Sequence, residues 1–175
     1  MCGVVAVVGK DSASSLVIEG LKKLEYRGYD SSGIASLDKN KLQILKSKGK
    51  LNKLIDKFNI SIENQSYKDT KVAIGHTRWA THGNVNIENA HPLVSEDKVA
   101  VVHNGIIENY NELKKQLISE GFYFESLTDT EVIPHLFSKY INLGNNLLDA
   151  GKLVLNDIKG AFAFVAISSS FPDEL

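Results

Sequence analysis

The positions of apolar side chains divide the 175-residue chain into short strands and amphipathic helices. Unbroken apolar runs predict buried strands, and apolar residues repeated every three or four positions predict helices with one buried face. The predicted strands are residues 3–8, 34–37, 42–45, 72–77, 99–103, 122–124 and 161–167. The predicted helices cover residues 12–24, 51–58, 109–120, 128–137 and 147–155.

Turn and capping residues mark the boundaries of several of these elements. The polar stretch 38–40 lies between two predicted strands and predicts a hairpin. Asn109 with Glu112, and Thr128 with Glu131, have the spacing of capping boxes, in which two side chains satisfy the first free N–H groups of a helix. We therefore expect one helix to begin at each pair.

Residues 78–95 contain Pro, Gly and several Asn with little periodicity, which predicts a long surface loop of the kind that is often functional.

The order of the elements indicates the fold class. The strands occur in pairs, and the helices are grouped rather than strictly alternating with strands. This order favours an α+β fold, with antiparallel sheets and helices on their outer faces.

The composition is that of one globular domain, which we assign to residues 2–175. Apolar residues make up 43% of the chain and charged residues 23%. The formal net charge of −1 provides no general attraction for nucleic acid or acidic lipid. The apolar runs are too short to span a bilayer, and the N-terminus has no signal-peptide pattern. We therefore expect a cytoplasmic protein with no nucleic-acid or membrane partner.

The single cysteine, Cys2, follows the initiator methionine directly. One cysteine forms neither an internal disulfide nor a cysteine-based zinc cluster. The alternative role is a small apolar residue that opens a strand. A small second residue permits removal of Met1, however, which would leave a thiol and a free α-amine on one residue. In unperturbed peptides these groups titrate at about 8.5 and 7.7–8.0, so a proton passes easily between them.

Two charged residues could recognise the ends of an amino acid. Arg78 could form a bidentate pair with a carboxylate while the adjacent Trp79 shields the pair from water. The alternative is a surface arginine stacked on a tryptophan. Asp129 could hold an ammonium group, or it could support the first turn of its helix.

Asn104-Gly105 follows the predicted strand 99–103. The pair is a strong signal for a tight hairpin turn. The residues that follow have the pattern of a helix rather than of a returning strand. At the end of a buried strand, the pair could instead supply the two N–H donors of an oxyanion hole, which stabilises the negative oxygen formed when a carbonyl is attacked.

Three of the five histidines, His76, His82 and His91, lie close together in the sequence, with His103 further along. Their spacings match no common ligand pattern, so the sequence disfavours a metal site and favours hydrogen bonding as their role. No cofactor is implied. A thiol nucleophile, an oxyanion hole, an arginine and an aspartate together describe a site for an amino acid with a scissile carbonyl in its side chain.

The motifs identify the chain with a known family. It resembles the glutaminase domains of the glutamine–fructose-6-phosphate aminotransferase family, which are class II glutamine amidotransferases. The matching motifs, in order, are MCGVVAVVG, LEYRGYDSSGIA, HTRWATHG, NAHP, VVHNGIIENY and TDTEVI. Related purine-pathway amidotransferases share the Cys-Gly, Arg-Gly and Asn-Gly elements but lack the EYRGYDS and RWATHG spellings.

The resemblance implies a four-layer αββα sandwich of the N-terminal-nucleophile hydrolase type, and it implies roles for individual residues. Cys2 would attack L-glutamine with its own α-amine as general base, and Asn104 with the Gly105 backbone would form the oxyanion hole. Arg78 and Asp129 would clamp the substrate. Trp79, Thr81 and His82 would line or cover its pocket. Arg27 and Gly28 would hold the cysteine loop in position.

The resemblance also implies partners. The sugar-isomerase domains of the family are absent from this chain, so transfer of ammonia to fructose-6-phosphate would need the acceptor domain of the full-length polypeptide. The full-length protein is expected to form a homo-oligomer. The alternatives are an amidotransferase domain that serves another acceptor, and a non-catalytic domain of the same fold.

Overall fold

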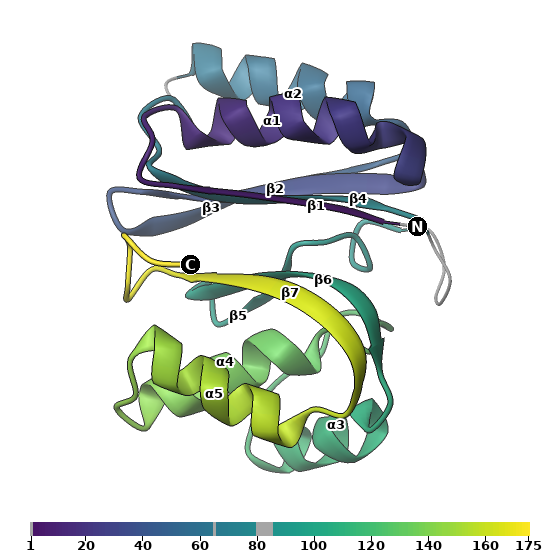
Figure 1. The fold of residues 1–175 in the computed structure, drawn as a ribbon, viewed down its shortest axis with the longest axis vertical. Coiled ribbons are helices and arrows are strands. Elements are labelled where there is room, and N and C mark those ends of the chain that lie inside the picture. Colours follow the sequence, from purple (N-terminus) through teal and green to yellow (C-terminus); the bar gives the residue numbers. More distant parts are fainter. Residues whose placement is uncertain (1, 65, 80–85) are drawn as a thin grey trace.

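Two antiparallel sheets lie face to face in the computed structural model, with helices on both outer surfaces (Figure 1). The structure describes residues 2–64, 66–79 and 86–175. The layers therefore follow the order helix, sheet, sheet, helix, and the predicted αββα sandwich is confirmed.

The first sheet contains the N-terminal strand and has the order β1-β4-β2-β3. Its members are β1 (Gly3–Val8), β2 (Ser31–Asp38), β3 (Lys41–Lys48) and β4 (Val72–Arg78). The predicted hairpin joins β2 to β3 through Lys39 and Asn40, both with positive φ, as a tight hairpin turn requires. Because β1 pairs only with β4 in this sheet, the first residues of the chain lie beside the end of β4.

The second sheet has the order β5-β6-β7 and contains β5 (Leu93–Ser95), β6 (Val99–Ile107) and β7 (Gly160–Ser168). Strands β6 and β7 pair along their whole lengths, from Val99 opposite Ser168 to Ile107 opposite Gly160. A small apolar cluster that includes Ile74, Val102 and Ile167 fills the space between the two sheets.

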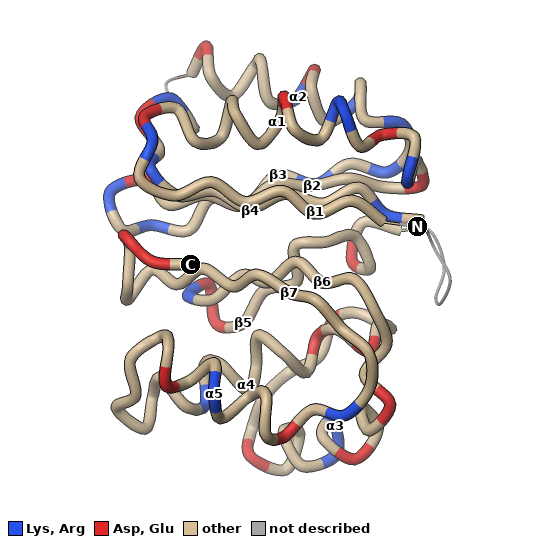
Figure 2. The backbone as a smooth tube through the Cα atoms, in the orientation of Figure 1, with Lys and Arg blue, Asp and Glu red and all other residues tan. Residues whose placement is uncertain are grey.

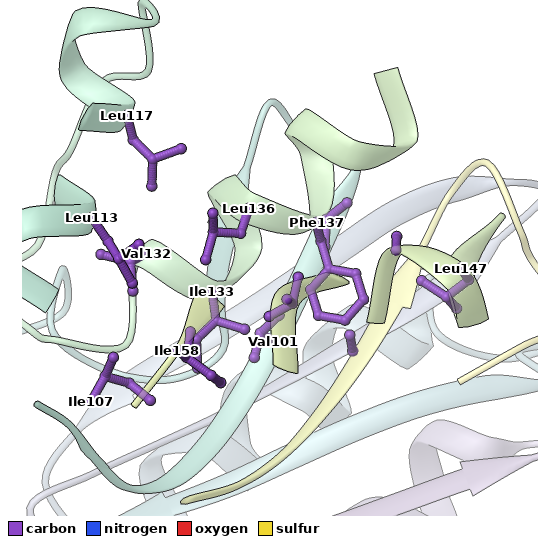
Figure 3. Close-up of a cluster of buried hydrophobic side chains, with 14 residues drawn as sticks. Val101, Ile107, Leu113, Leu117, Val132, Ile133, Leu136, Phe137, Leu147 and Ile158 are labelled. Carbon is purple, nitrogen blue, oxygen red and sulfur yellow. The ribbon is translucent and has the colours of Figure 1, made fainter. Parts of the chain in front are cut away.

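Helices α1 (Ala13–Leu24) and α2 (Leu51–Glu63) cover the first sheet, and the short helix η1 (Glu25–Arg27) follows α1. Helices α3 (Tyr110–Ser119), α4 (Val132–Asn142) and α5 (Leu147–Asp157) cover the second. Figure 3 shows the larger of the two outer cores, where leucine, isoleucine and phenylalanine side chains of these helices meet Val101 of β6. Burial of each such side chain contributes about 1.5–3 kcal/mol to folding.

Two sequence predictions fail because of packing between distant segments. Residues 122–124 form no strand; the rings of Phe122 and Phe124 pack against His135 instead. Residues 78–95 are not one surface loop, because β4 continues through Arg78 and β5 occupies 93–95. Among the described residues of that segment, Asn89 is fully buried.

Neither predicted capping box forms. The Asn109 side chain makes no cap bond to its own helix; its amide nitrogen donates to the Asp157 carbonyl and its amide oxygen accepts from the Lys159 N–H. Helix α4 begins at Val132, and the Glu131 carboxylate accepts from two N–H groups of the preceding loop rather than completing a box with Thr128. In both cases a side chain satisfies backbone groups outside its own helix.

Charged residues lie mainly on the outer helices and connecting loops, and the central strands carry few (Figure 2). Within the described ranges, no helix is long and apolar enough to cross a membrane.

Candidate active site

A cavity of about 420 Å³ opens beside the start of β1, the end of β4 and the middle of β6. Its lining comes from β4 and β6, from η1, from the segment before α4 and from residues close to the ends of β1, β4 and β5: Cys2, Arg27, His76, Arg78, Trp79, His91, His103, Asn104, Gly105, Ile106, Thr128, Asp129 and Thr130. Seven of the ten residues that the sequence predicted for the site therefore belong to this lining. Gly28 lies just outside it, and Thr81 and His82 fall outside the described residues.

Cys2 is half-buried and directly precedes β1. The Trp79 N–H points to its Sγ at 3.3 Å, and the thiol lies 3.6 Å from the Trp79 carbonyl oxygen. Both backbone polar groups of Trp79 therefore hold the sulfur in place. The pairing of β1 with β4 thus fixes the sulfur at the edge of the cavity.

Gly28 packs tightly against the backbone where β4 ends. A Cβ on Gly28 would lie 2.7 Å from the Arg78 carbonyl carbon and 2.9 Å from the Trp79 nitrogen. The contact is held in place because the Asp30 N–H donates to the Arg78 carbonyl at 3.0 Å. Only glycine permits this approach, so Gly28 supports the segment that contacts Cys2. Arg27 lines the cavity and donates from Nε to the Tyr26 hydroxyl at 3.1 Å.

Asn104 and Gly105 lie inside β6, which continues to Ile107. The prediction that the strand ends at Asn104-Gly105 is therefore wrong, and so is the hairpin-turn alternative. Gly105 has a φ of 134°, a conformation that side chains disfavour. The amide nitrogen Nδ2 of Asn104 donates to the Cys2 carbonyl oxygen at 3.1 Å, which joins the two sheets at the cavity.

Arg78 and Asp129 reach the cavity from opposite halves of the sandwich, Arg78 from β4 and Asp129 from the segment before α4. Arg78 is the last residue of β4 and is buried, with 6% of its surface exposed, so it is not the surface arginine of the alternative interpretation. Burial lowers the pKa of its guanidinium, while the charges of Cys2, Asp30 and Asp129 oppose that effect. A carboxylate ligand would therefore recover solvation that this guanidinium has lost.

Asp129 precedes α4 by three residues, so it does not serve in that helix's first turn. Its Oδ2 accepts from the Ile107 N–H at 2.7 Å. This bond holds the carboxylate at the cavity and leaves Oδ1 as a directed acceptor. Trp79, at 42% exposure, lines the same cavity and contacts the Tyr29 ring edge-on at 5.1 Å.

Three histidines in the cavity wall had no site role in the sequence analysis beyond hydrogen bonding. His76 Nε2 lies 2.9 Å from Asn104 Oδ1, and its ring stacks on that of His91 at 4.3 Å. Burial lowers the pKa of His76 to about 4, lowers that of His91 well below its usual range, and lowers that of His103. All three rings are therefore neutral near pH 7. No group of three potential metal-ligating side chains occurs in the part of the chain that the structure describes.

Solved structures with a similar fold define the class. Glutamine phosphoribosylpyrophosphate amidotransferase from B. subtilis matches with a TM-score of 0.75 and 31% identity, over 97% of this chain and 35% of that one. A glutamine aminotransferase class-II domain protein from Silicibacter pomeroyi matches with a TM-score of 0.58 and 13% identity over 97% of this chain and 73% of that one, which shows the fold alone. The architecture is that of the N-terminal-nucleophile amidotransferases.

Sequence comparison narrows the class to a family. The sequence profile of the glutamine amidotransferase domain family matches residues 76–171, and the chain belongs to that family. It is 48% identical to glutamine–fructose-6-phosphate aminotransferase [isomerizing] of Thermosynechococcus vestitus and 49% identical to that of Aquifex aeolicus, over its whole length in both cases. The chain spans 28% of the length of each of these relatives. The family resemblance inferred from the motifs is confirmed.

Proposed function

We propose that this domain hydrolyses the side-chain amide of L-glutamine to glutamate and ammonia, with Cys2 as the nucleophile. One observation carries the proposal: Cys2, Asn104, Arg78 and Asp129, from separate segments of the chain, line a single cavity. The substrate needs one group for its α-carboxylate, one for its α-ammonium and two for its reacting amide. These four residues match that need in charge and in chemistry.

The reaction needs the free α-amine of Cys2, and so needs removal of Met1, which falls outside the described residues. The amine takes the thiol proton as Sγ attacks the amide carbon, and the carbonyl oxygen becomes negative. The Asn104 Nδ2 and the Gly105 N–H stabilise that oxygen, each by roughly 3–4 kcal/mol. Collapse breaks the C–N bond, the protonated amine supplies the proton to the departing ammonia, and a thioester remains. Water then attacks the thioester, releases glutamate and restores the thiol.

Recognition of glutamine rests on the two charged residues. The Arg78 guanidinium would pair with the α-carboxylate in a bidentate arrangement, and Oδ1 of Asp129 would accept from the α-ammonium. Trp79, with Thr81 and His82, would cover the bound amino acid. Arg27 and Gly28 would keep the cysteine segment in position, which the close packing of Gly28 on the β4 backbone supports.

The ammonia released here would be used by a second domain. We propose that the full-length polypeptide delivers the ammonia to fructose-6-phosphate on a linked isomerase domain, and that it does so as a homo-oligomer. The names of the relatives at 48% and 49% identity support this acceptor. A phosphoribosylpyrophosphate acceptor is the alternative, because a solved structure at 31% identity carries that name.

The test is an assay of the protein with glutamine, with asparagine and with glutamine plus fructose-6-phosphate. We expect glutamate and ammonia in equal amounts from glutamine, little from asparagine, and no activity in Cys2→Ala. The domain alone should form no glucosamine-6-phosphate, whereas the full-length protein should. A glutamine-mimicking electrophile should add its mass to the N-terminal peptide only. Hydrolysis that persists in Cys2→Ala would refute the proposed nucleophile.

A further inference from the structure

The Asn104 side chain is held between the Cys2 carbonyl and an imidazole in the wall of the cavity. Its Nδ2 lies 3.1 Å from the Cys2 carbonyl oxygen, and its Oδ1 lies 2.9 Å from His76 Nε2. His76 comes from β4 of the first sheet and Asn104 from β6 of the second, so this contact bridges the two layers.

The chemistry of these partners permits one arrangement of protons. A carbonyl oxygen only accepts hydrogen bonds, so the Cys2 carbonyl requires the NH₂ end of the Asn104 amide. The oxygen end of the amide then faces His76 Nε2, which must donate. Because His76 is fully buried and neutral near pH 7, its ring carries one N–H, and that proton lies on Nε2. By hydrogen-bond geometry the other nitrogen, Nδ1, has no partner within the described residues, as this tautomer allows; the nearby His103 backbone raises the pKa of the ring, but burial outweighs it.

An asparagine amide has two orientations of similar shape, because its terminal torsion is nearly two-fold. The reversed orientation would place Oδ1 against the Cys2 carbonyl and at the site of the developing negative oxygen. It would therefore replace a stabilising donor with a repulsive acceptor. The Cys2 carbonyl selects one orientation from one side, and the His76 N–H selects the same orientation from the other.

The His76 ring is itself restrained. The His91 ring stacks on it with centroids 4.3 Å apart and an interplanar angle of 28°. The His103 N–H donates to His91 Nδ1 at 3.2 Å, and the His103 ring is hydrogen-bonded to the Thr130 hydroxyl at 2.8 Å. Stacking and hydrogen bonding thus connect His76 to the second sheet and limit the rotation of its imidazole.

We propose that His76 is a positioning residue that fixes the orientation of the Asn104 amide, so that Nδ2 faces Cys2 and the oxygen of the reacting carbonyl. This inference rests on the proposed function, in which Asn104 Nδ2 stabilises the transition state. His76 itself does not touch the substrate in this assignment. Its effect should therefore appear in kcat and not in the binding of glutamine.

The experiment compares two substitutions of His76 in the full-length protein. In Gln, the amide nitrogen is as many bonds from Cβ as Nε2 is in His, so His76→Gln can still donate to Asn104 Oδ1. His76→Leu cannot. We expect His76→Leu to lower kcat roughly tenfold or more, but by no more than the roughly 10²–10³-fold of Asn104→Ala, with KM nearly unchanged. We expect His76→Gln to recover most of that loss.

Two controls separate positioning from general damage. His135 is also a buried histidine, bonded to the Ser95 hydroxyl and outside this cavity, so His135→Leu should keep the kcat of the wild type. In the double variant of His76→Leu with Asn104→Ala, the loss should equal that of Asn104→Ala alone, because a residue that acts through Asn104 has no effect once the amide is gone.

Several outcomes would overturn the proposal. They are an unchanged kcat in His76→Leu, equal losses in His76→Leu and His135→Leu, or multiplicative losses in the double variant. If His76→Leu does not fold, imidazole ¹⁵N shifts of the wild type at neutral pH decide, because a proton on Nδ1 rather than Nε2 contradicts the arrangement. A wild-type protein that releases no ammonia from glutamine refutes the proposed function itself, and this inference with it.

Discussion

Gly105 allows a test in which the size of the effect follows from the structure. A Cβ on Gly105 would lie 2.1 Å from the Ala161 carbonyl oxygen of β7, roughly 1 Å short of an ordinary contact. The φ of 134° adds backbone strain for any side chain. Strain of this kind costs about 1–3 kcal/mol, and the crowding of a backbone atom adds about 1–3 kcal/mol. Gly105→Ala should therefore lower the unfolding free energy by about 2–6 kcal/mol.

The same substitution should impair catalysis. To relieve the contact, β6 must move away from β7, and the Gly105 N–H moves with it. A displacement of about 1 Å at a positioned group can cost roughly 10²-fold in rate. We expect kcat to fall by about that factor in protein that is still folded at 25 °C, because domains of this size unfold with about 5–15 kcal/mol.

Gly121→Ala is the matched control. Gly121 also has a positive φ, of 96°, but a Cβ there meets no atom within 4 Å. We expect a loss of about 1 kcal/mol and hence a Tm lower by roughly 2–4 °C, with unchanged kcat. Thermal unfolding and glutamate formation measure the two effects. An equal fall in Tm for both variants would show that the contact with Ala161 is relieved at no cost, and an unchanged kcat in Gly105→Ala would remove its N–H from the oxyanion hole.

Further variants test recognition, activation and the effect of pH. Arg78→Lys should raise KM for glutamine at least tenfold, because an ammonium does not reproduce a bidentate pair. Asp129→Asn should also raise KM. If either variant keeps the wild-type kcat/KM, the substituted residue does not bind the substrate as proposed. Protein whose intact mass includes Met1 should be at least roughly 10²-fold less active, because the Cys2 nitrogen is then a peptide nitrogen; full turnover would indicate another base. The unfolding free energy should fall between about pH 6.5 and 4. The unfolded state binds a proton at the ordinary histidine pKa, whereas burial lowers the pKa of His76 to about 4. This pKa difference corresponds to on the order of 3 kcal/mol of unfolding free energy. Denaturant unfolding of His76→Gln over the same pH range should not show this loss.

The elements of the fold could be predicted from the sequence because their signals are local. An unbroken apolar run identified β1, repeated apolar positions identified both helices of the first outer layer, and the polar stretch 38–40 identified the hairpin between β2 and β3. The position of Cys2 directly after Met1 indicated its chemistry without any knowledge of its neighbours. Arg78, Asn104 and Asp129 could be proposed in the same way, because charge and donor capacity belong to the residue type.

The boundaries and partners depended on the tertiary structure. The Asn-Gly pair is a turn signal in isolation. In the structure, however, β7 pairs with β6 past Asn104 and Gly105, so the strand continues to Ile107. Asn109 has the sequence of a helix cap, yet its side chain satisfies backbone groups near residues 157–159. In each case backbone groups of a distant segment take the place of the local partners.

The sequence by itself determined the number and type of most elements, the nucleophile and the charges available for a substrate. It gave no indication that His76 lies 2.9 Å from Asn104, or that Asp129 is held by the Ile107 N–H, because such contacts join residues of different layers. Periodicity encodes which face of a strand is buried, but not which side chain of the other sheet it meets. That pairing is decided only when the two sheets pack and each buried polar group finds a partner.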